Sequence, residues 1–344
     1  MSADIRRRLI GWEGLLLVFL VVVLGFNMAT NPRYLEIGNQ VNLFTLGIEK
    51  SIVILVMAFV IMTGEIDLSV ASMMGLAAAV VAALFEQGVP MEIAVLVALA
   101  VGLGFGLING FFVAIVGIPS LAVTLAGYIG FRGLARLLVE DRSVGSFPDW
   151  FTALGQDGLL GPITGPMLLY LVMAILAVTI MHLTGFGRST IVIGNSVSVA
   201  RFSGVRVARV KIAIFAASGL IAALAGVLIA ARLGAVRAST ADGFELDIIT
   251  VVLLGGVSIF GGSGTMIGVL LSSILVLNLR NGLVIAGITG NTQTGIIGLL
   301  LILSVLVPNL VGAGRERFRR RAADRAAPPP GTSGEGVSVR PSGG

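Results

Sequence analysis

Residues 51–85 read SIVILVMAFVIMTGEIDLSVASMMGLAAAVVAALF, two apolar runs on either side of the short polar link TGEIDLS at residues 63–69. Each run approaches the roughly 20 apolar residues that an α-helix needs to cross a hydrocarbon core about 30 Å thick. A link of this length joins two neighbouring antiparallel helices. The stretch therefore predicts a helical hairpin inside a membrane.

The rest of the chain repeats this pattern. Its 344 residues are 56% hydrophobic and 12% charged, with a mean hydropathy of +1.02, whereas soluble domains carry about 25% charged residues. The sequence therefore predicts an all-α polytopic membrane protein. About ten apolar runs have the length of a membrane crossing or approach it, at residues 11–30, 45–63, 68–85, 91–116, 120–139, 166–183, 212–231, 246–261, 265–280 and 294–311.

Basic residues indicate the side of the membrane on which the loops lie. They gather before the first run, after the sixth run and after the last run, and an even number of runs puts all three places on one side. Because Lys and Arg are enriched in cytoplasmic loops, both termini are expected in the cytoplasm, with the protein in the inner (cytoplasmic) membrane. This distribution also argues against nucleic acid as a partner, despite the net charge of +5.

Two regions follow from this arrangement. Residues 1–311 are expected to form the transmembrane domain, in direct contact with the lipid bilayer. Residues 312–344 begin with a basic stretch and end rich in Pro, Gly and Ser, with too few apolar residues to fold around a core. They are expected to form a disordered cytoplasmic tail.

The chain lacks, or has very few of, the residue types that most enzymes use for catalysis. The chain has no cysteine, a single histidine, His182, and only two lysines, Lys50 and Lys211. These counts argue against thiolate or histidine metal sites, and neither lysine follows the glycine of a phosphate-binding GxxxxGK[ST] loop. We therefore expect no enzyme activity, no metal, no bound cofactor and no ATP site on this chain.

The link at residues 63–69 has two interpretations. As a turn, it uses Gly64 for the reversal and Asp67 or Ser69 to cap the next helix. As a functional element, it places the carboxylates of Glu65 and Asp67 near the membrane, where charges are costly and often functional. All four residues are therefore candidates for gating or substrate passage as well as for a capped turn.

A second Gly-rich link, at residues 260–265, has the same two interpretations, with Ser263 or Thr265 as the cap. Elsewhere, the four-residue spacing of Gly102, Gly106 and Gly110 predicts a close contact between helices. Polar side chains within the runs either line a path or bridge helices, and the sequence leaves both roles open. The candidates for the path are Asn109, Thr124, Thr250, Ser272, Ser273 and Asn278.

Two acidic patches suggest an internal repeat. The sequence GEID at residues 64–67 begins the third run, and GFELD at residues 243–247 begins the eighth. Runs that are five apart cross the membrane in opposite directions, as in the inverted repeats of transporters. The second to fifth runs are therefore predicted to repeat, inverted, as the seventh to tenth.

The loop at residues 185–211 contains a short predicted helix. Asn195 or Ser196 is a good N-cap, residues 197–203 supply about two turns, and Gly204 suits the left-handed position after the helix. This helix is expected to present outwards the side chains of Val199, Ala200, Arg201 and Phe202. An exposed apolar helix either binds a partner protein or lies on the bilayer surface.

Three segments, in order, resemble the permease subunits of carbohydrate ABC importers of the ribose, rhamnose and autoinducer-2 type. They are GEIDLSVAS at residues 64–72, the loop at residues 194–205, and GGVSIFGGSGT at residues 255–265. The resemblance extends over nearly all of residues 12–309. The first segment is similar to the family pattern GGIDLSVGS, from which Glu65 and Ala71 depart, because the family usually has glycine at both positions.

The resemblance implies a function and partners. The partners are an ATP-binding subunit that hydrolyses ATP with Mg²⁺, an extracytoplasmic sugar-binding protein, and a second permease subunit in a homodimer or heterodimer. The expected cargo is a monosaccharide or related small polyol. The helix that docks into the ATP-binding subunit is implied to use Gly194, Asn195, Ser196, Ala200, Arg201, Phe202, Ser203 and Gly204. The residues alone also allow an ion-coupled secondary transporter that uses Glu65 and Asp67.

Overall fold

The computed structural model describes residues 12–140, 142–288, 290, 292, 293, 295, 296, 298, 299 and 302. Most of the predicted tenth run and the whole of the predicted tail lie outside the described residues, as do both chain ends. The number of crossings beyond α14 and the side on which the termini lie therefore stay predictions.

Helices make up most of the described chain. They are α2 (Trp12–Thr30), α3 (Ile37–Thr45), α4 (Ile48–Met62), α5 (Val70–Glu86), α6 (Met91–Phe111), the π-helix η1 (Phe112–Val116), α7 (Ser120–Val139), α8 (Asp149–Gln156), α9 (Gly165–Leu183), α10 (Gly185–Asn195), α11 (Val197–Phe202), α12 (Val207–Leu233), α13 (Phe244–Leu254) and α14 (Met266–Ile285). Two small antiparallel ladders join loops, β1 (Val144–Gly145) with β4 (Ala235–Val236) and β2 (Gly158–Leu160) with β3 (Ile163–Thr164).

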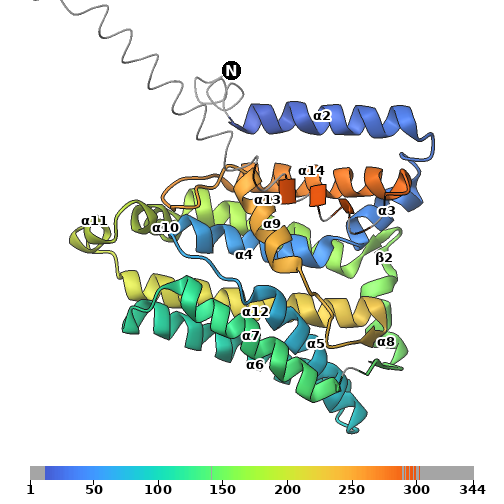
Figure 1. The fold of residues 1–344 in the computed structure, drawn as a ribbon, viewed down its shortest axis with the longest axis horizontal. Helices are drawn as coiled ribbons and strands as arrows, with labels where there is room; N and C mark the ends of the chain where they lie inside the picture. The colour runs from blue at the N-terminus through green and yellow to red at the C-terminus, as the bar shows by residue number, and fades with distance from the viewer. Residues whose placement is uncertain are drawn as a thin grey trace, which may run out of the picture.

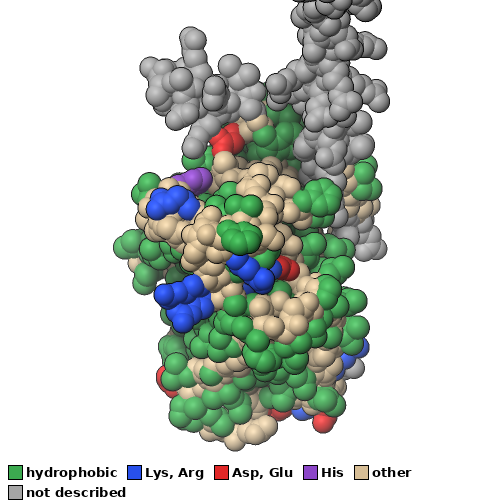
Figure 2. All heavy atoms as spheres, turned by 90° about the vertical axis from the view of Figure 1, so that its left-hand side faces the viewer, with side chains coloured by type: hydrophobic (Ala, Val, Ile, Leu, Met, Phe, Trp, Pro, Cys, Tyr) green, Lys and Arg blue, Asp and Glu red, His purple; other side chains and the backbone are tan. Residues whose placement is uncertain are grey.

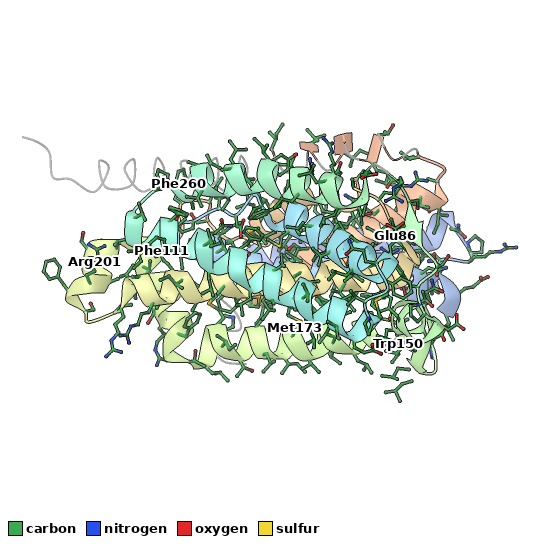
Figure 3. All side chains as sticks on the ribbon, turned by 90° about the horizontal axis from the view of Figure 1, so that it is seen from below. Glu86, Phe111, Trp150, Met173, Arg201 and Phe260 are labelled. Carbon is green, nitrogen blue, oxygen red and sulfur yellow. The ribbon has the colours of Figure 1, made fainter. Side chains whose placement is uncertain are left out.

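The long helices lie side by side along one axis (Figure 1). The short helices α10 and α11 occupy one end of the bundle, and α3, α8 and β2 occupy the other. Seen from below, Arg201 and Phe260 lie at the first end, while Glu86 and Trp150 lie at the second (Figure 3). Because Lys and Arg are enriched in cytoplasmic loops, the basic loop favours the α10–α11 end as the cytoplasmic end, and this orientation stays a prediction.

The described residues contain fewer full crossings than the expected ten. Among the described residues, six helices are long and apolar enough to cross a membrane, and α3 with α4, bent by 50° between them, makes a seventh. Helix α5 is apolar but has 17 residues. Helix α13 has 11 residues, which at a rise of 1.5 Å per residue reach about 16 Å, roughly half of the hydrocarbon core. Ten full crossings are therefore not confirmed.

The end of α13 corrects the predicted boundary of the eighth run. The helix stops at Leu254 rather than at Gly261. Gly256 has a left-handed backbone with φ of 84°, and the indole N–H of Trp12 donates to the Leu254 carbonyl at 2.7 Å. A left-handed glycine ends a helix readily, and a side-chain donor satisfies a carbonyl that the helix leaves free.

Helix α4 lies at the centre of the bundle, because every one of its residues except Lys50 is buried. The outer helices instead expose apolar side chains; Val21 on α2 and Leu96 on α6 are more than 60% exposed. In a membrane such faces contact lipid tails, so their exposure carries no penalty of the kind it has in water.

The predicted glycine stripe packs α6 against α12. A Cβ atom added to Gly219 of α12 would lie 2.2 Å from the Gly102 carbonyl oxygen, and one added to Gly106 would lie 2.5 Å from that of Phe215. Such separations are possible only for glycine, so the close helix contact is confirmed. Gly110 shares it, with the Ile212 Cα at 3.0 Å from its added Cβ.

Candidate functional site

Three segments that are far apart in the sequence meet at the α10–α11 end. The Gly262 N–H donates to the Met62 carbonyl at 2.9 Å, and the Asn195 side-chain amide donates to the Gly262 carbonyl at 2.9 Å. A Cβ at Gly194 would lie 2.1 Å from the Met62 oxygen. The ends of α4 and α10 and the Gly-rich link therefore form one tight junction, which we call the cytoplasmic junction.

The same junction includes the turn after α4. Gly64 and Gly261 both have a φ of 81°, and a Cβ at Gly261 would lie 2.6 Å from the Gly64 nitrogen. Both positions require glycine, because the left-handed conformation and the close backbone approach disfavour any side chain. The turn role predicted for Gly64 is confirmed, and the three segments that carried the family resemblance lie together.

Helix α11 has the predicted caps. The Ser196 hydroxyl accepts from the Val199 N–H at 3.3 Å, and Gly204 is left-handed with φ of 79°. The Gly204 and Val205 N–H groups donate to the carbonyls of Arg201 and Ala200, each at 3.0 Å. These two bonds form a Schellman motif, which fixes the end of a helix too short to be stable alone.

Helix α11 presents a large aromatic side chain to solvent. Phe202 is 94% exposed and Val199 is 56% exposed. Ala200 is fully buried and packs with Ile193 and Val207, so the expectation that it faces outwards is wrong. It lies on the face of α11 that anchors the helix to α10 and α12.

Lys and Arg side chains form separate patches on this end of the molecule (Figure 2). The exposed arginines of the α10–α12 region are Arg188, Arg201, Arg206 and Arg209. An exposed aromatic side chain among arginines has the composition of a protein docking surface, in which Phe and Arg are enriched. Ser203 and Gly204 are also exposed on it.

Glu65 forms an ion pair with Lys211 near the start of α12. Each side chain is only 13% exposed, so each charge depends on the other for compensation. The acid that departs from the family pattern therefore has its counter-charge 146 residues further along the chain. The pair ties the turn after α4 to α12.

We expect the loss of this ion pair to lower the stability of the fold. Replacing Lys211→Met alone leaves the Glu65 carboxylate partly buried and unpaired, which we expect to lower the free energy of unfolding by about 2 kcal/mol. The double variant Glu65→Gly with Lys211→Met removes both charges and is expected to recover most of that loss. Thermal unfolding of the purified chain in detergent measures both. A double variant as unstable as the single one would contradict the pairing.

Asp67 is the centre of a buried polar network. Its carboxylate accepts from the Ser69 N–H at 2.9 Å, the Ser69 hydroxyl at 2.6 Å and the Ser218 hydroxyl at 2.8 Å. The Asn109 amide donates in turn to the Ser69 hydroxyl at 3.1 Å. These bonds connect the start of α5 with α6 and α12. Ser69 makes no cap bond of its own, so Asp67 is the residue that holds this turn.

The other polar candidates are also buried and bonded to helices. Thr124 donates to the carbonyls of Ser120 at 2.8 Å and Ile66 at 3.2 Å. Thr250 donates to Leu246 at 2.6 Å, and Asn278 donates to Ile274 at 2.7 Å and accepts from the Tyr34 hydroxyl. The bonds of Thr124 to Ile66 and of Tyr34 to Asn278 supply the bridging role, whereas the bond of Thr250 stays within α13. A role in lining the path stays a prediction.

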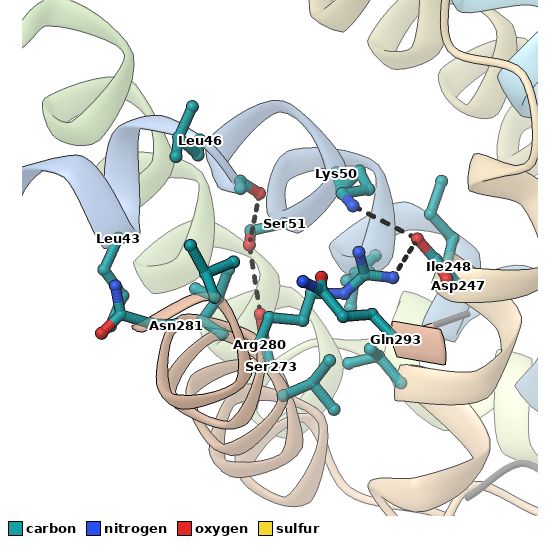
Figure 4. A pocket seen from close by; sticks show the side chains of 16 residues that line it. Leu43, Leu46, Lys50, Ser51, Asp247, Ile248, Ser273, Arg280, Asn281 and Gln293 are labelled. Atoms are coloured by element: carbon teal, nitrogen blue, oxygen red, sulfur yellow. Dashed lines mark hydrogen bonds and ion pairs between the residues drawn. The ribbon is translucent and has the colours of Figure 1, made fainter. Parts of the chain in front are cut away.

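At the opposite end from α11, three charged side chains meet beside a cavity (Figure 4). Lys50 Nζ lies 3.2 Å and Arg280 Nη2 2.6 Å from the same oxygen, Oδ2 of Asp247. They come from α4, α14 and α13. We call this space, of about 230 Å³, the outer cavity.

Sequence reasoning identified one residue of the outer cavity, the path candidate Ser273, but missed the role of its three charged residues. A signal was present, because Lys50 and Arg280 are charged residues within apolar runs, where charges are often functional. Asp247 appeared only as part of the GFELD patch. The partnership of the three residues could not be read from the sequence, since Lys50 and Asp247 are 197 residues apart.

The ion pairs at the two ends of the bundle connect the two predicted repeats: the acidic patch of each repeat pairs with a lysine of the other. Lys211, near the start of α12, pairs with the acid of the GEID patch, and Lys50, near the start of α4, pairs with an acid of the GFELD patch. Gly64 and Gly243, which begin the two patches, both have φ of 81°. An inverted repeat of α4–α7 with α12 onwards would produce this relation, although the repeat itself stays a prediction.

Apolar crossing helices, a charged cavity among them and an anchored basic loop helix together define a multi-pass membrane transport subunit. The profile of the family described as "Branched-chain amino acid transport system / permease component" matches residues 39–305. The chain therefore belongs to this permease family, within the branch of carbohydrate ABC importers of the ribose and autoinducer-2 type.

Two relatives support this assignment. The chain is 36% identical over 304 residues to the "Autoinducer 2 import system permease protein LsrD" of Yersinia enterocolitica, covering 86% of this chain and 91% of the relative. It is 34% identical over 325 residues to the protein of that name in Escherichia coli O9:H4, covering 93% and 98%. No solved structure matches.

Proposed function

We propose that this chain is the membrane-spanning permease subunit of an ATP-driven importer in the cytoplasmic membrane. The observation that carries the proposal is α11: a capped helix that is anchored through Ala200 and presents Phe202 to solvent. A membrane protein gains nothing by holding an aromatic side chain in the cytosol unless a partner covers it. The proposed partner is an ABC ATP-binding subunit.

The cytoplasmic junction supports a mechanism for coupling. Asn195 at the end of α10 bonds to Gly262, and Gly262 bonds to Met62 at the end of α4. If the ATPase displaced α11, the tightly packed backbone contacts of the cytoplasmic junction would therefore transmit the movement to α4. Helix α4 is buried along its length and continues to Lys50 in the outer cavity, so it connects the docking surface with the far end of the bundle.

The remaining parts of the proposed importer are supplied by other chains. ATP with Mg²⁺ binds the partner, because this sequence has no GxxxxGK[ST] loop. A second permease subunit completes the path, and an extracytoplasmic binding protein delivers the cargo. The proposed cargo is a monosaccharide or related small polyol. The relatives are named as permeases of an autoinducer 2 import system, which supports an importer of small molecules.

The ion-coupled alternative requires an acid that is free to exchange a cation. Asp67 accepts three hydrogen bonds in a buried network, and Glu65 is neutralised by Lys211. Both acids therefore have structural partners that a proton or sodium ion would have to displace. This favours the ATP-driven importer.

Uptake in cells tests the proposal. The chain is co-expressed with candidate cassette ATPase and binding-protein subunits, in a host lacking its own sugar importers, and given a panel of radiolabelled monosaccharides and sugar acids. We expect uptake to persist when a protonophore collapses the proton gradient, and to stop when the ATPase carries a hydrolysis-deficient substitution. Uptake that needs the gradient but not the ATPase would favour the secondary transporter instead.

A further inference from the structure

The outer cavity contains more positive than negative charge. The described residues that line it include two bases, Lys50 and Arg280, and a single acid, Asp247. Their side chains are 14%, 26% and 17% exposed. Charges are costly at such burial, and they persist in membrane segments chiefly where they serve a function.

Its ion pairing differs from that of Glu49 and Glu65, and is the reverse of the cluster in which Arg132 faces two acids, Asp242 and Glu245. Glu49 has one partner, Arg232, with Nε to Oε1 at 2.5 Å, and Glu65 has one partner, Lys211. In the outer cavity two cations share a single carboxylate oxygen. One cation would satisfy Asp247, so the second is in excess of what a structural ion pair requires.

We propose that the outer cavity binds the carboxylate of a small polyhydroxylated acid, that is, a sugar acid. This inference rests on the proposed function, whose cargo class it narrows. A bound carboxylate would balance the charge to two positive and two negative groups, whereas a neutral polyol or a zwitterionic amino acid would leave the excess charge in place. In a medium of low dielectric constant, that balance favours the anion.

The cavity wall is mainly apolar, with a few hydroxyl and amide groups among the apolar side chains, as in sites for small hydroxylated molecules. The cavity volume of about 230 Å³ is below the roughly 300–1,000 Å³ of pockets for drug-sized ligands. The hydroxyls of Ser51 and Ser273 lie 3.2 Å apart on its wall, and the amides of Asn281 and Gln293 also line it. Hydroxyl and amide groups both donate and accept, as recognition of several sugar hydroxyls requires.

The position of the cavity fits a molecule in transit. Lys50 begins α4 and Arg280 lies near the end of α14, both at the end of the bundle opposite α11. A cargo that arrives from outside would meet these cations first. Asp247 would then compete with the cargo for them, so that binding stays weak enough for release.

An anionic lipid headgroup offers similar chemistry, because phosphatidylglycerol also combines one negative charge with hydroxyls. The test therefore uses the full chain in nanodiscs of phosphatidylcholine alone. Unfolding midpoints are measured during titration with gluconate, sorbitol and leucine, which represent the acid, a neutral polyol of the same carbon number, and a zwitterion. We expect gluconate to bind about tenfold more tightly than either of the others.

Variants identify the residues responsible. Arg280→Met and Lys50→Met are expected to remove the preference for gluconate, each leaving one cation paired with Asp247. Asp247→Asn is expected to strengthen gluconate binding severalfold, because the competing carboxylate is gone. Lys211→Met is the matched control, since it breaks the buried ion pair with Glu65 at the other end of the bundle. It should lower the unfolding midpoint and leave the preference unchanged.

Several outcomes would overturn the inference. Equal binding of gluconate and sorbitol, tighter binding of leucine, or a preference that survives both cation variants would each do so. Loss of gluconate binding in nanodiscs containing phosphatidylglycerol, with Arg280→Met insensitive to that lipid, would assign the cavity to a headgroup. If any of these results were found together with ATP-driven uptake of neutral monosaccharides, the inference about the cavity would fail and the proposed function would stand. Uptake that does not need the ATPase would contradict the proposed function without altering the binding measured in nanodiscs.

Discussion

The substitution Phe202→Ala is expected to lower ATP-driven uptake by about 30-fold or more, with little change in the stability of the isolated chain. Phe202 is 94% exposed, so the fold loses almost no packing when the ring is removed. A single aromatic anchor at the centre of a protein interface contributes about 2 kcal/mol or more to binding. Since a tenfold change corresponds to about 1.4 kcal/mol, this is roughly a 30-fold loss of association with the ATPase.

The measurement is co-purification of the ATPase with the chain, together with uptake in cells. Phe26→Ala is the matched control, because Phe26 is also exposed, at 66%, but lies on the outer face of α2. Arg201→Ala is expected to have a smaller effect, since it removes a charge and leaves the ring. Full ATPase retention and uptake in the Phe202 variant would rule out α11 as the docking helix.

Replacement of Asp67→Ala is expected to lower the free energy of unfolding by about 3–5 kcal/mol, because three buried donor groups lose their acceptor. The substitution leaves the Ser69 N–H and the hydroxyls of Ser69 and Ser218 without the acceptor that each now uses. Thermal unfolding of the purified chain measures the loss. We expect little folded protein to reach the membrane.

Asp67→Asn is the companion variant, because it keeps the size of the side chain and one carbonyl oxygen. We expect it to lower stability by only about 1–2 kcal/mol and to retain ATP-driven uptake. An ion-coupled transporter that uses this acid predicts the opposite result. A fully stable Asn variant without uptake would therefore contradict both the structural role of Asp67 and the choice of mechanism.

Much of the fold was predictable because its determinants are local. Each of the first nine predicted runs corresponds to a helix, and the run at residues 120–139 has the bounds of α7. Apolar length relative to bilayer thickness is a property of one segment at a time. The bend between α3 and α4 and the early end of α13 were not predictable, because packing against other segments sets them. The bond from Trp12 to Leu254 joins residues 242 positions apart.

The candidate site divides in the same way. The caps of α11 involve residues three to five positions apart, so Ser196 and Gly204 could be assigned from sequence. Ala200 was assigned to the wrong face, because its burial depends on Ile193 and Val207 from the flanking helices. The partners of Asp67 and Glu65 on α12 were equally hidden from a local argument.

The sequence by itself determined the membrane class, the approximate helices, the basic side and the exposed loop helix, because hydrophobic length, charge bias and capping act over one or a few turns. Only the tertiary structure decided which polar residues bridge helices and which face a cavity. It brought the three glycine-containing segments into one junction and set Lys50 and Arg280 on Asp247. Those contacts depend on how helices distant in sequence pack, since the energy of a buried charge is set by its neighbours in space.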